Sequence, residues 1–211
     1  MTMKNILIIG AHYDDAELGG GGTAARLIAE GKSVYKITLT NTVVYSEDLK
    51  LDITNERARQ NSKDACSILG VKEIEFETAQ YGQLVYSQKM MQDLETVIRD
   101  YHIDTVFCHF NEDYQTDHIA ASQICRTAAR HCANILMYQS NPYITPQTFD
   151  PNIFVDISEY VELKKKALQC YDSEHDRQGR LFETNILRNQ IWGYGNHVAS
   201  AEGFVSIKCL L

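Results

Sequence analysis

The sequence contains few prolines, a deficit of basic residues and no long apolar run. Only three prolines occur, and no segment rich in proline or glycine divides the 211 residues into parts. Lys and Arg number 20 against 28 Asp and Glu, and the net charge of -8 disfavours a broad nucleic-acid-binding surface. An anionic small molecule stays compatible with this balance, because local charge can oppose the total. No apolar run approaches the ~20 residues that a membrane-spanning helix needs. We therefore expect one domain over residues 1–211 that binds no nucleic acid and has no transmembrane segment.

Paired cysteines of the kind that bind metals or form a disulfide framework are also missing. The six cysteines form no CxxC pair, and several lie inside apolar runs, where a reduced thiol behaves as a small hydrophobic residue. No signal-peptide pattern precedes the first apolar stretch. These features favour a reducing, cytoplasmic environment over a secreted scaffold.

Apolar runs alternate with segments of helical spacing along most of the chain. This rhythm predicts a parallel sheet covered by helices on both faces, which is an α/β, Rossmann-like three-layer fold with a mostly parallel sheet. Loops are expected at 41–53 and 111–116. We predict strands at 5–10, 33–40, 73–77, 104–109, 134–139, 153–157 and 204–208, and helices at 23–30, 54–69, 87–101, 118–132, 159–171 and 182–192.

Two polar clusters follow predicted strands. His12, Asp14 and Asp15 come after the first strand. The second cluster follows the strand at 104–109 and consists of Glu112, Asp113, Asp117 and His118. Parallel strands place their carboxyl ends at one edge of a sheet, so the two clusters are expected to meet. Two histidines and a carboxylate are a typical ligand set for catalytic zinc, which keeps one position open for water. A second carboxylate beside that water can take its proton.

Each of these residues also has a purely structural interpretation. Asp14 and Asp15 can cap the helix that follows, and Asp117 can cap the helix at 118–132. The four glycines at 19–22 can serve only for a tight turn and close packing of helix on sheet. From spacing alone, the metal site and the structural interpretation carry equal weight.

A nucleotide-binding protein is the main alternative that the fold suggests. A strand ending at Gly10 is typical of dinucleotide-binding folds, but the GxGxxG fingerprint is absent from the turn after it, as are GxxxxGK[ST] and GxSxG from the chain. Asp14, Asp15 and Glu17 would oppose a pyrophosphate at that turn. The acidic loop suits a cation better than a phosphate.

The sequence resembles the N-acetylglucosaminyl-phosphatidylinositol de-N-acetylase family, also called LmbE-like. The first segment, AHYDDAELGGGGTAARL, is similar to the AHPDD segment of that family. Four further segments match in the same order: RARQNSKDACSILGV from Arg57, DHIA from Asp117, FVDISEYVELKKKAL from Phe154 and AEGF from Ala201. Five ordered matches are more specific than any one of them, and they imply an LmbE-like fold.

The resemblance implies a zinc-dependent hydrolase, with Fe2+ as another candidate metal. It would remove an N-acetyl or other N-acyl group from a small sugar-like substrate: an amino sugar, a sugar conjugate or a sugar nucleotide. His12, Asp15 and His118 would bind the metal. Asp14 would be the general base, and Asp117 would assist catalysis from beside the metal ligands. Trp192 and Tyr194, near a glycine-rich stretch, could stack on a sugar ring or pack in the core.

Three positions depart from the family pattern. Tyr13 replaces a proline, Asn61 replaces an acidic residue, and Gln115 replaces a histidine expected to assist the oxyanion or leaving group. Gln115 itself, Tyr114 or His197 could take over that role. The change leaves open a degenerate member that binds its substrate without turnover. The irregular last third of the chain could also offer a homo-oligomer interface.

Overall fold

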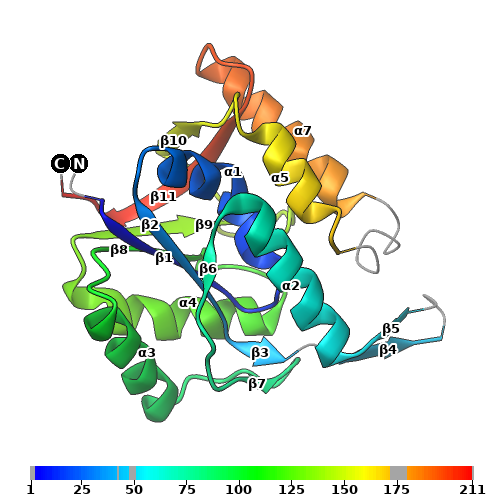
Figure 1. Cartoon of the computed structure of the whole chain (residues 1–211), viewed down its shortest axis with the longest axis vertical. Coiled ribbons are helices and arrows are strands. Elements are labelled where there is room, and N and C mark those ends of the chain that lie inside the picture. The colour runs from blue at the N-terminus through cyan, green and yellow to red at the C-terminus, as the bar shows by residue number, and fades with distance from the viewer. Residues whose placement is uncertain (1–2, 42, 48–50, 172–179, 211) are drawn as a thin grey trace.

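The computed structural model of the chain describes residues 3–41, 43–47, 51–171 and 180–210. A seven-stranded sheet with the order β10-β11-β9-β8-β1-β2-β6 forms its centre (Figure 1). Five neighbouring strands are parallel, and β11 runs antiparallel to both of its neighbours. The strands are β1 (Asn5–Gly10), β2 (Ser33–Thr38), β6 (Lys72–Glu73), β8 (Thr105–His109), β9 (Asn134–Tyr138), β10 (Ile153–Asp156) and β11 (Ala201–Lys208).

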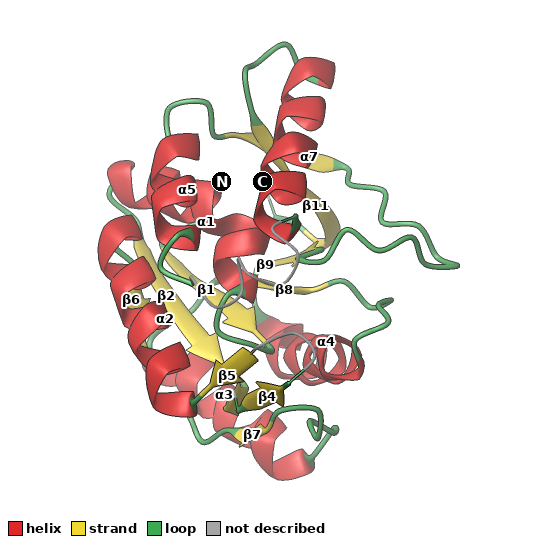
Figure 2. Cartoon of the chain, turned by 90° about the vertical axis from the view of Figure 1, so that its right-hand side faces the viewer, coloured by secondary structure: helices red, strands yellow, loops and turns green. Residues whose placement is uncertain are grey.

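Helices cover both faces of this sheet, which confirms the predicted three-layer α/β fold (Figures 1 and 2). Side chains of β1 alternate between the two cores: Ile6 and Ile8 face one, and Leu7 and Ile9 face the other. On the first face lie α1 (Asp15–Ala29), α2 (Asn55–Leu69), α5 (Val161–Leu168) and α7 (Leu181–Gly195); on the second lie α3 (Gln88–Asp100), α4 (Thr116–Ala128) and the short 3-10 helix η1 (Ala129–His131).

Local sequence signals account for several helix ends. Thr54 caps α2 by accepting a hydrogen bond from the backbone N–H of Arg57 at 3.2 Å. The same helix ends at Gly70, whose φ of 78° is the left-handed conformation that glycine adopts without a steric penalty. Ser87 caps α3 in the same way through the N–H of Met90. These signals explain why α2 and α3 lie within a residue of their predicted positions.

The start of α1 differs from the prediction. The helix begins at Asp15 rather than at residue 23, and it includes all four glycines. A Cβ atom on Gly19 would lie 2.1 Å from the ring of Tyr138, and one on Gly22 would lie 2.8 Å from Ile157. Close contact with neighbouring side chains therefore overrides the low helix propensity of glycine. As a result, α1 follows the first polar cluster directly.

A buried ion pair supports the kink inside α1. Gly20 has non-helical angles, which leaves backbone groups of the helix without their usual partners. The carboxylate of Glu202 accepts hydrogen bonds from the N–H groups of Gly22 and Thr23, at 3.0 and 2.7 Å. Lys164 donates to this carboxylate and to the carbonyl of Leu18. Residues from β11 and α5 thus fix the helix that leaves the first polar cluster.

The remaining strands are short or differ in length from the prediction. The segment expected as loop 41–53 contains a hairpin of β4 (Val44–Ser46) and β5 (Leu51–Ile53), while residues 42 and 48–50 lie outside the described residues. β3 (Thr40–Asn41) pairs with β7 (Ala79–Gln80), and the strand expected at 73–77 is reduced to β6. Within the described residues, no helix is both long and apolar enough to cross a membrane.

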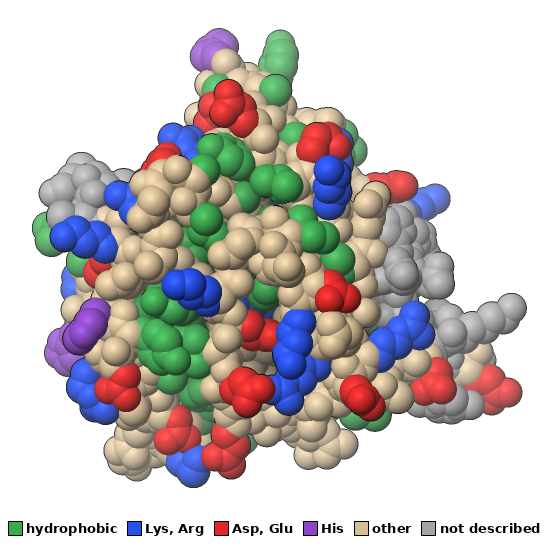
Figure 3. Space-filling model, viewed as in Figure 1, with side chains coloured by type: hydrophobic (Ala, Val, Ile, Leu, Met, Phe, Trp, Pro, Cys, Tyr) green, Lys and Arg blue, Asp and Glu red, His purple; other side chains and the backbone are tan. Residues whose placement is uncertain are grey.

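Acidic and basic side chains are mixed over the face seen in Figure 3. In the part of that face that the structure describes, lysine and arginine do not gather into a large patch. The mixture agrees with the acidic net charge of -8.

Candidate metal centre

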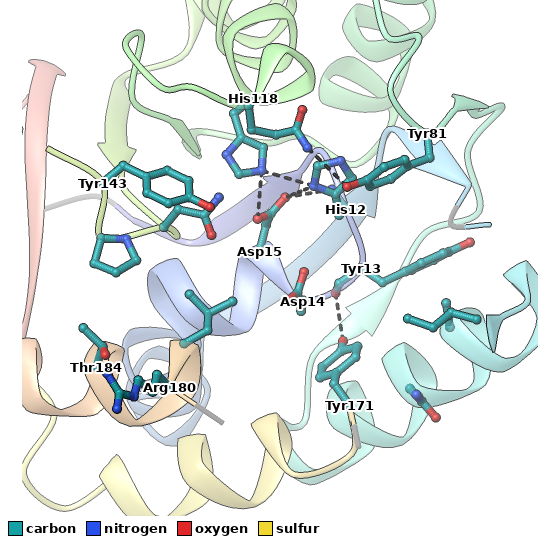
Figure 4. Close-up of a pocket in the computed structure, with 17 residues that line it drawn as sticks. His12, Tyr13, Asp14, Asp15, Tyr81, His118, Tyr143, Tyr171, Arg180 and Thr184 are labelled. Atoms are coloured by element: carbon teal, nitrogen blue, oxygen red, sulfur yellow. Dashed lines mark hydrogen bonds and ion pairs between the residues drawn. The ribbon is translucent and has the colours of Figure 1, made fainter. Parts of the chain in front are cut away.

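The two polar clusters meet at the carboxyl ends of β1 and β8. β1 ends at Gly10, and the turn after it carries His12 before α1 begins at Asp15. β8 ends at His109, and His118 lies in the first turn of α4. Figure 4 shows both imidazoles and the carboxylate of Asp15 directed toward one another. The parallel sheet thus brings together residues up to 106 positions apart in the sequence.

The spacing of these three side chains suits a single metal ion. Nδ1 of His12 lies 3.1 Å from Nε2 of His118 and 3.4 Å from Oδ2 of Asp15. Nε2 of His118 lies 3.3 Å from Oδ1 of Asp15. Tetrahedral zinc with bonds of about 2.0–2.1 Å holds neighbouring ligand atoms about 3.3 Å apart. The two imidazole nitrogens thus lie near tetrahedral spacing, each has one oxygen of Asp15 beside it, and the ligand atoms of the three residues lie within 4.8 Å of one another.

The outer nitrogen of each imidazole faces a carboxylate. Nε2 of His12 lies 3.1 Å from Oδ2 of Asp117, and Nδ1 of His118 lies 2.8 Å from Oδ2 of Asp113. A carboxylate accepts a hydrogen bond from the N–H of the ring nitrogen beside it, so in the neutral ring the inner nitrogen presents a lone pair. Two lone pairs 3.1 Å apart repel unless a proton or a cation lies between them. Two imidazoles and a carboxylate oriented in this way fit a divalent metal.

Electrostatics at the cluster favour positive charge. Burial alone would lower the pKa of both imidazoles, because it disfavours their charged forms. Hydrogen bonds with Asp117 and Asp15 nevertheless raise the pKa of His12 to about 9. The charge of Asp15 and a hydrogen bond with Asp113 raise the pKa of His118 to about 10. Burial opposes ionisation of Asp15 too, yet the charge of the His118 imidazole holds the pKa of Asp15 well below its usual range. A proton or a divalent cation can satisfy this field.

Asp117 orients His12 and does not cap α4. Its carboxylate accepts hydrogen bonds from the backbone N–H groups of Gly82 and Leu84, at 2.7 and 3.0 Å, besides facing His12. Burial would raise the pKa of Asp117, but these hydrogen bonds lower it. The capping residue of α4 is Gln115, so the structural interpretation of Asp117 as the cap is wrong. The carboxylate of Asp117 thus ties the chain between β7 and α3 to the cluster.

His109 lies beneath the cluster. Its ring stacks on that of His118 with centroids 4.1 Å apart, and its Nε2 lies 3.1 Å from Oδ2 of Asp15. The backbone N–H of Ala11 donates to the same Nε2, so this nitrogen carries no proton. Burial and the nearby His118 lower the pKa of His109 to about 4. A neutral His109 therefore supports the ring of His118 without adding charge.

Asp14 lies beside the cluster on the wall of a pocket of about 360 Å³. It is the residue before α1, but its side chain makes no capping hydrogen bond, so the helix does not account for an acid at this position. His12, Asp15 and His118 line the same pocket (Figure 4). Its other walls come from the segments around Tyr81, the loop after β9, α2 and the start of α7, and their lining residues include Asn61, Asn141, Pro142, Tyr143, Tyr171, Arg180, Leu181 and Thr184.

Gln115 lines this pocket and is held from two sides. Its side-chain oxygen accepts from the backbone N–H of Asp117 at 3.4 Å, and its amide nitrogen donates to the hydroxyl of Tyr81 at 3.3 Å. The ring of Tyr81 in turn contacts that of His12, with centroids 4.8 Å apart. Gln115 and Tyr81 therefore form a neutral, hydrogen-bonded edge next to the cluster.

The other side chains predicted near the pocket lie elsewhere. Tyr114 is two-thirds exposed and contacts Tyr143 edge-on, while His197 is exposed beyond the end of α7. Neither is among the residues that line the pocket. Trp192 packs against two phenylalanines and a guanidinium, and Tyr194 points to solvent. Of the three candidates for the role of the missing histidine, Gln115 is the one placed at the pocket.

Tyr13 is anchored by a buried network. Its carbonyl accepts hydrogen bonds from the ammonium of Lys36 at 2.5 Å and from the hydroxyl of Tyr171 at 2.8 Å. The same ammonium donates to both carboxylate oxygens of Glu17, at 2.7 and 2.8 Å, and to the hydroxyl of Ser62. Two hydrogen bonds thus fix the peptide between Tyr13 and Asp14. No sequence pattern indicates this network, because a lone lysine in a strand is typical of a solvent-facing position.

Comparisons with known proteins agree with the fold and the motifs. The chain is 32% identical over 180 residues to a protein of Escherichia coli K12 named uncharacterized deacetylase YaiS, covering 81% of this chain and 91% of that one. It is 26% identical to the diacetylchitobiose deacetylase of Thermococcus kodakarensis, over 82% of this chain and 70% of that one. The crystal structure of the conserved protein TT1542 from Thermus thermophilus matches with a TM-score of 0.82 and 26% identity, covering 99% and 97% of the two chains.

The sequence model of one protein family covers more than half of the chain. It matches residues 7–129, which include both polar clusters, the grouped histidines and Asp15, and it is described as GlcNAc-PI de-N-acetylase. The chain therefore belongs to the PIG-L family of GlcNAc-PI de-N-acetylases and LmbE-like deacetylases.

Proposed function

We propose that this chain is a zinc-dependent hydrolase that removes an N-acetyl or similar N-acyl group from an amino sugar, a sugar conjugate or a sugar nucleotide. The observation that carries the proposal is the cluster of His12, Asp15 and His118, in which both outer imidazole nitrogens face carboxylates and both inner nitrogens face one point. The names of the deacetylase relatives support the reaction, and the pocket of about 360 Å³ suits a small ligand.

The metal ligands of this proposal are His12, Asp15 and His118. When bound, the ion supplies Lewis acidity that polarises the acyl carbonyl and acidifies the attacking water. Asp113 and Asp117 keep the protonated side of each imidazole turned away from the pocket. The stack of His109 on His118 limits rotation of that ring.

Asp14 is the general base in this proposal. Its carboxylate lines the pocket beside the cluster, and the hydrogen bonds that Lys36 and Tyr171 donate to the carbonyl of Tyr13 fix the peptide that precedes it. Asp14 takes a proton from the attacking water and returns it to the leaving nitrogen, so that acetate and a free amine result. The amide of Gln115 offers a neutral N–H donor to the developing oxyanion.

The experiment compares wild-type protein with Asp14→Asn and His118→Ala on N-acetylated amino sugars, with released amine as the readout and bound zinc measured in parallel. Wild type should release amine and hold zinc. Asp14→Asn should hold zinc while its turnover falls by about 10²–10⁴-fold, the usual contribution of a general base. His118→Ala should lose both. Turnover by Asp14→Asn at the wild-type rate would remove Asp14 from the mechanism.

The same experiment tests the alternative of a family member that binds without turnover. Gln115 makes this alternative specific, because a neutral amide replaces the histidine of the family pattern at the pocket. A zinc-loaded wild-type protein that binds an N-acetylated sugar but releases no amine would establish it. The variant Gln115→His should then introduce turnover.

A further inference from the structure

One wall of the pocket carries a cation. Arg180 directly precedes α7, and Leu181 and Thr184 in the first turn of that helix line the same wall. Figure 4 places Arg180 and Thr184 on the side of the pocket away from His118 and Tyr81. The pocket therefore offers a ligand one side near His12, Asp15 and His118 and another side near Arg180.

The charges of the lining favour an anion at this wall. Asp14 and Asp15 lie at the end of the pocket where the metal is proposed to bind. Among the described residues that line the pocket, Arg180 is the only lysine or arginine. With a divalent ion in the proposed centre, the lining becomes net positive. The chain as a whole carries a net charge of -8, so the attraction for an anion is local to this pocket.

Arg180 differs in its pairing from four arginines that are bound to carboxylates. Within the described part of the chain its guanidinium has no hydrogen bond or ion pair, and its side chain is exposed. Four other arginines are bound to carboxylates: Arg26, Arg59, Arg99 and Arg130. A guanidinium presents a planar fork that matches the two oxygens of a carboxylate or a phosphate. The hydroxyl of Thr184, one helical turn further, offers another donor on the same wall.

We propose that the substrate carries an anionic oxygen group, a carboxylate or a phosphate ester, which Arg180 binds at the end of the pocket away from the metal. The inference rests on the proposed deacetylation and narrows its substrate class. Neutral lining residues such as Asn141 and Tyr143 then contact the sugar between the two ends. Arg180 acts as a specificity residue that selects anionic N-acylated amino sugars over neutral ones.

The test measures kcat/KM of zinc-loaded protein on three probes: N-acetylglucosamine, its 6-phosphate, and N-acetylmuramic acid, which carries a carboxylate. Wild type should prefer one or both anionic probes, and the preferred one identifies the anion. Arg180→Gln should lower kcat/KM for that probe about 10–100-fold, the usual effect of losing a charge-assisted hydrogen bond. The neutral probe should be unaffected, and Arg180→Lys should recover part of the loss. Arg99→Gln, which removes an exposed arginine distant from the pocket lining, is the matched control and should change nothing.

Equal turnover of neutral and anionic probes by wild type, or equal losses for all probes in Arg180→Gln, would overturn the proposal. Binding of the same probes, measured by calorimetry, separates this failure from failure of the proposed reaction. If wild type releases no amine but binds an anionic probe at least 10-fold more tightly than Arg180→Gln does, the proposed anion binding by Arg180 is supported and the proposed deacetylation is refuted. If neither turnover nor binding distinguishes the two proteins, the subsite is refuted.

Discussion

Replacement of Lys36 by methionine should be among the most damaging single changes in this chain. Lys36 is only 1% exposed, and its ammonium donates hydrogen bonds to both carboxylate oxygens of Glu17. Methionine keeps the side-chain length but removes every donor. Glu17, itself 1% exposed, would then hold a buried negative charge without its cation. The carbonyl of Tyr13 would keep only the hydroxyl of Tyr171 as a donor.

The size of the effect follows from the burial of the pair. Removing one partner of a buried, hydrogen-bonded ion pair costs about 3–5 kcal/mol, because the remaining charge is left uncompensated. Burial already raises the pKa of Glu17 despite the nearby ammonium, so the loss of Lys36 should raise this pKa further. A group whose folded pKa lies above its unfolded pKa stabilises the fold only at low pH. The destabilisation by Lys36→Met should therefore be smaller at pH 5 than at pH 8.

Urea unfolding of metal-free protein, followed by circular dichroism, measures this cost. The double variant Lys36→Met/Glu17→Leu is the matched control, because it removes both charges. It should recover most of the stability that the single variant loses. A cost below about 1 kcal/mol for Lys36→Met, or a double variant as unstable as the sum of its single changes, would refute the argument from buried charge.

Three further predictions concern the proposed metal site and α1. Asp113→Asn should lower zinc affinity about 10–100-fold and retain the fold, because the carboxylate that orients the imidazole of His118 is lost. Competition with a chelator measures this affinity, and an unchanged value would contradict the role of Asp113. The raised pKa values of about 9 for His12 and about 10 for His118 mean that zinc must displace protons from both imidazoles. Zinc affinity should therefore rise between pH 6 and pH 9. An affinity that does not change with pH would count against both residues as ligands. Gly19→Ala should destabilise the protein by about 1–3 kcal/mol in urea unfolding, because its Cβ would lie 2.1 Å from the ring of Tyr138. Gly195→Ala is the control and should not destabilise the protein, because the space around Gly195 is open. Equal effects of the two variants would contradict the close packing of α1.

The grouping of His12, Asp15 and His118 was predictable from the sequence because its parts follow simple rules. β1 has the pattern of a buried strand, and a polar turn follows it, so His12 and Asp15 had to lie at the carboxyl edge of the sheet. The parallel alternation placed His118 at the same edge. Spacing alone left a structural interpretation open, and the structure supports the cluster by the facing nitrogens of His12 and His118.

The start of α1 was not predictable, because four consecutive glycines indicate a turn on local grounds. The helix there depends on contacts with the ring of Tyr138 and with the side chain of Ile157, which are distant in sequence. The ion pair of Lys164 with Glu202 supports the kink from two further elements. Such tertiary contacts leave no periodic signal in the chain.

The pocket walls were harder to predict than the cluster. Tyr81, Tyr143 and Arg180 come from loops and from the start of a helix, where side-chain directions follow no sequence period. Trp192 and Tyr194, which the sequence offered as candidates for sugar stacking, lie outside the lining residues. Aromatic composition alone therefore did not locate the pocket wall.

The most direct test of the proposed function is zinc binding together with amine release by the intact chain. We predict one zinc per chain in the wild-type protein, loss of that zinc in His12→Ala and His118→Ala, and release of amine from an N-acetylated amino sugar that stops on chelation and returns with zinc. A wild-type protein that binds no divalent metal, or one that releases amine equally well after chelation, would contradict the proposal.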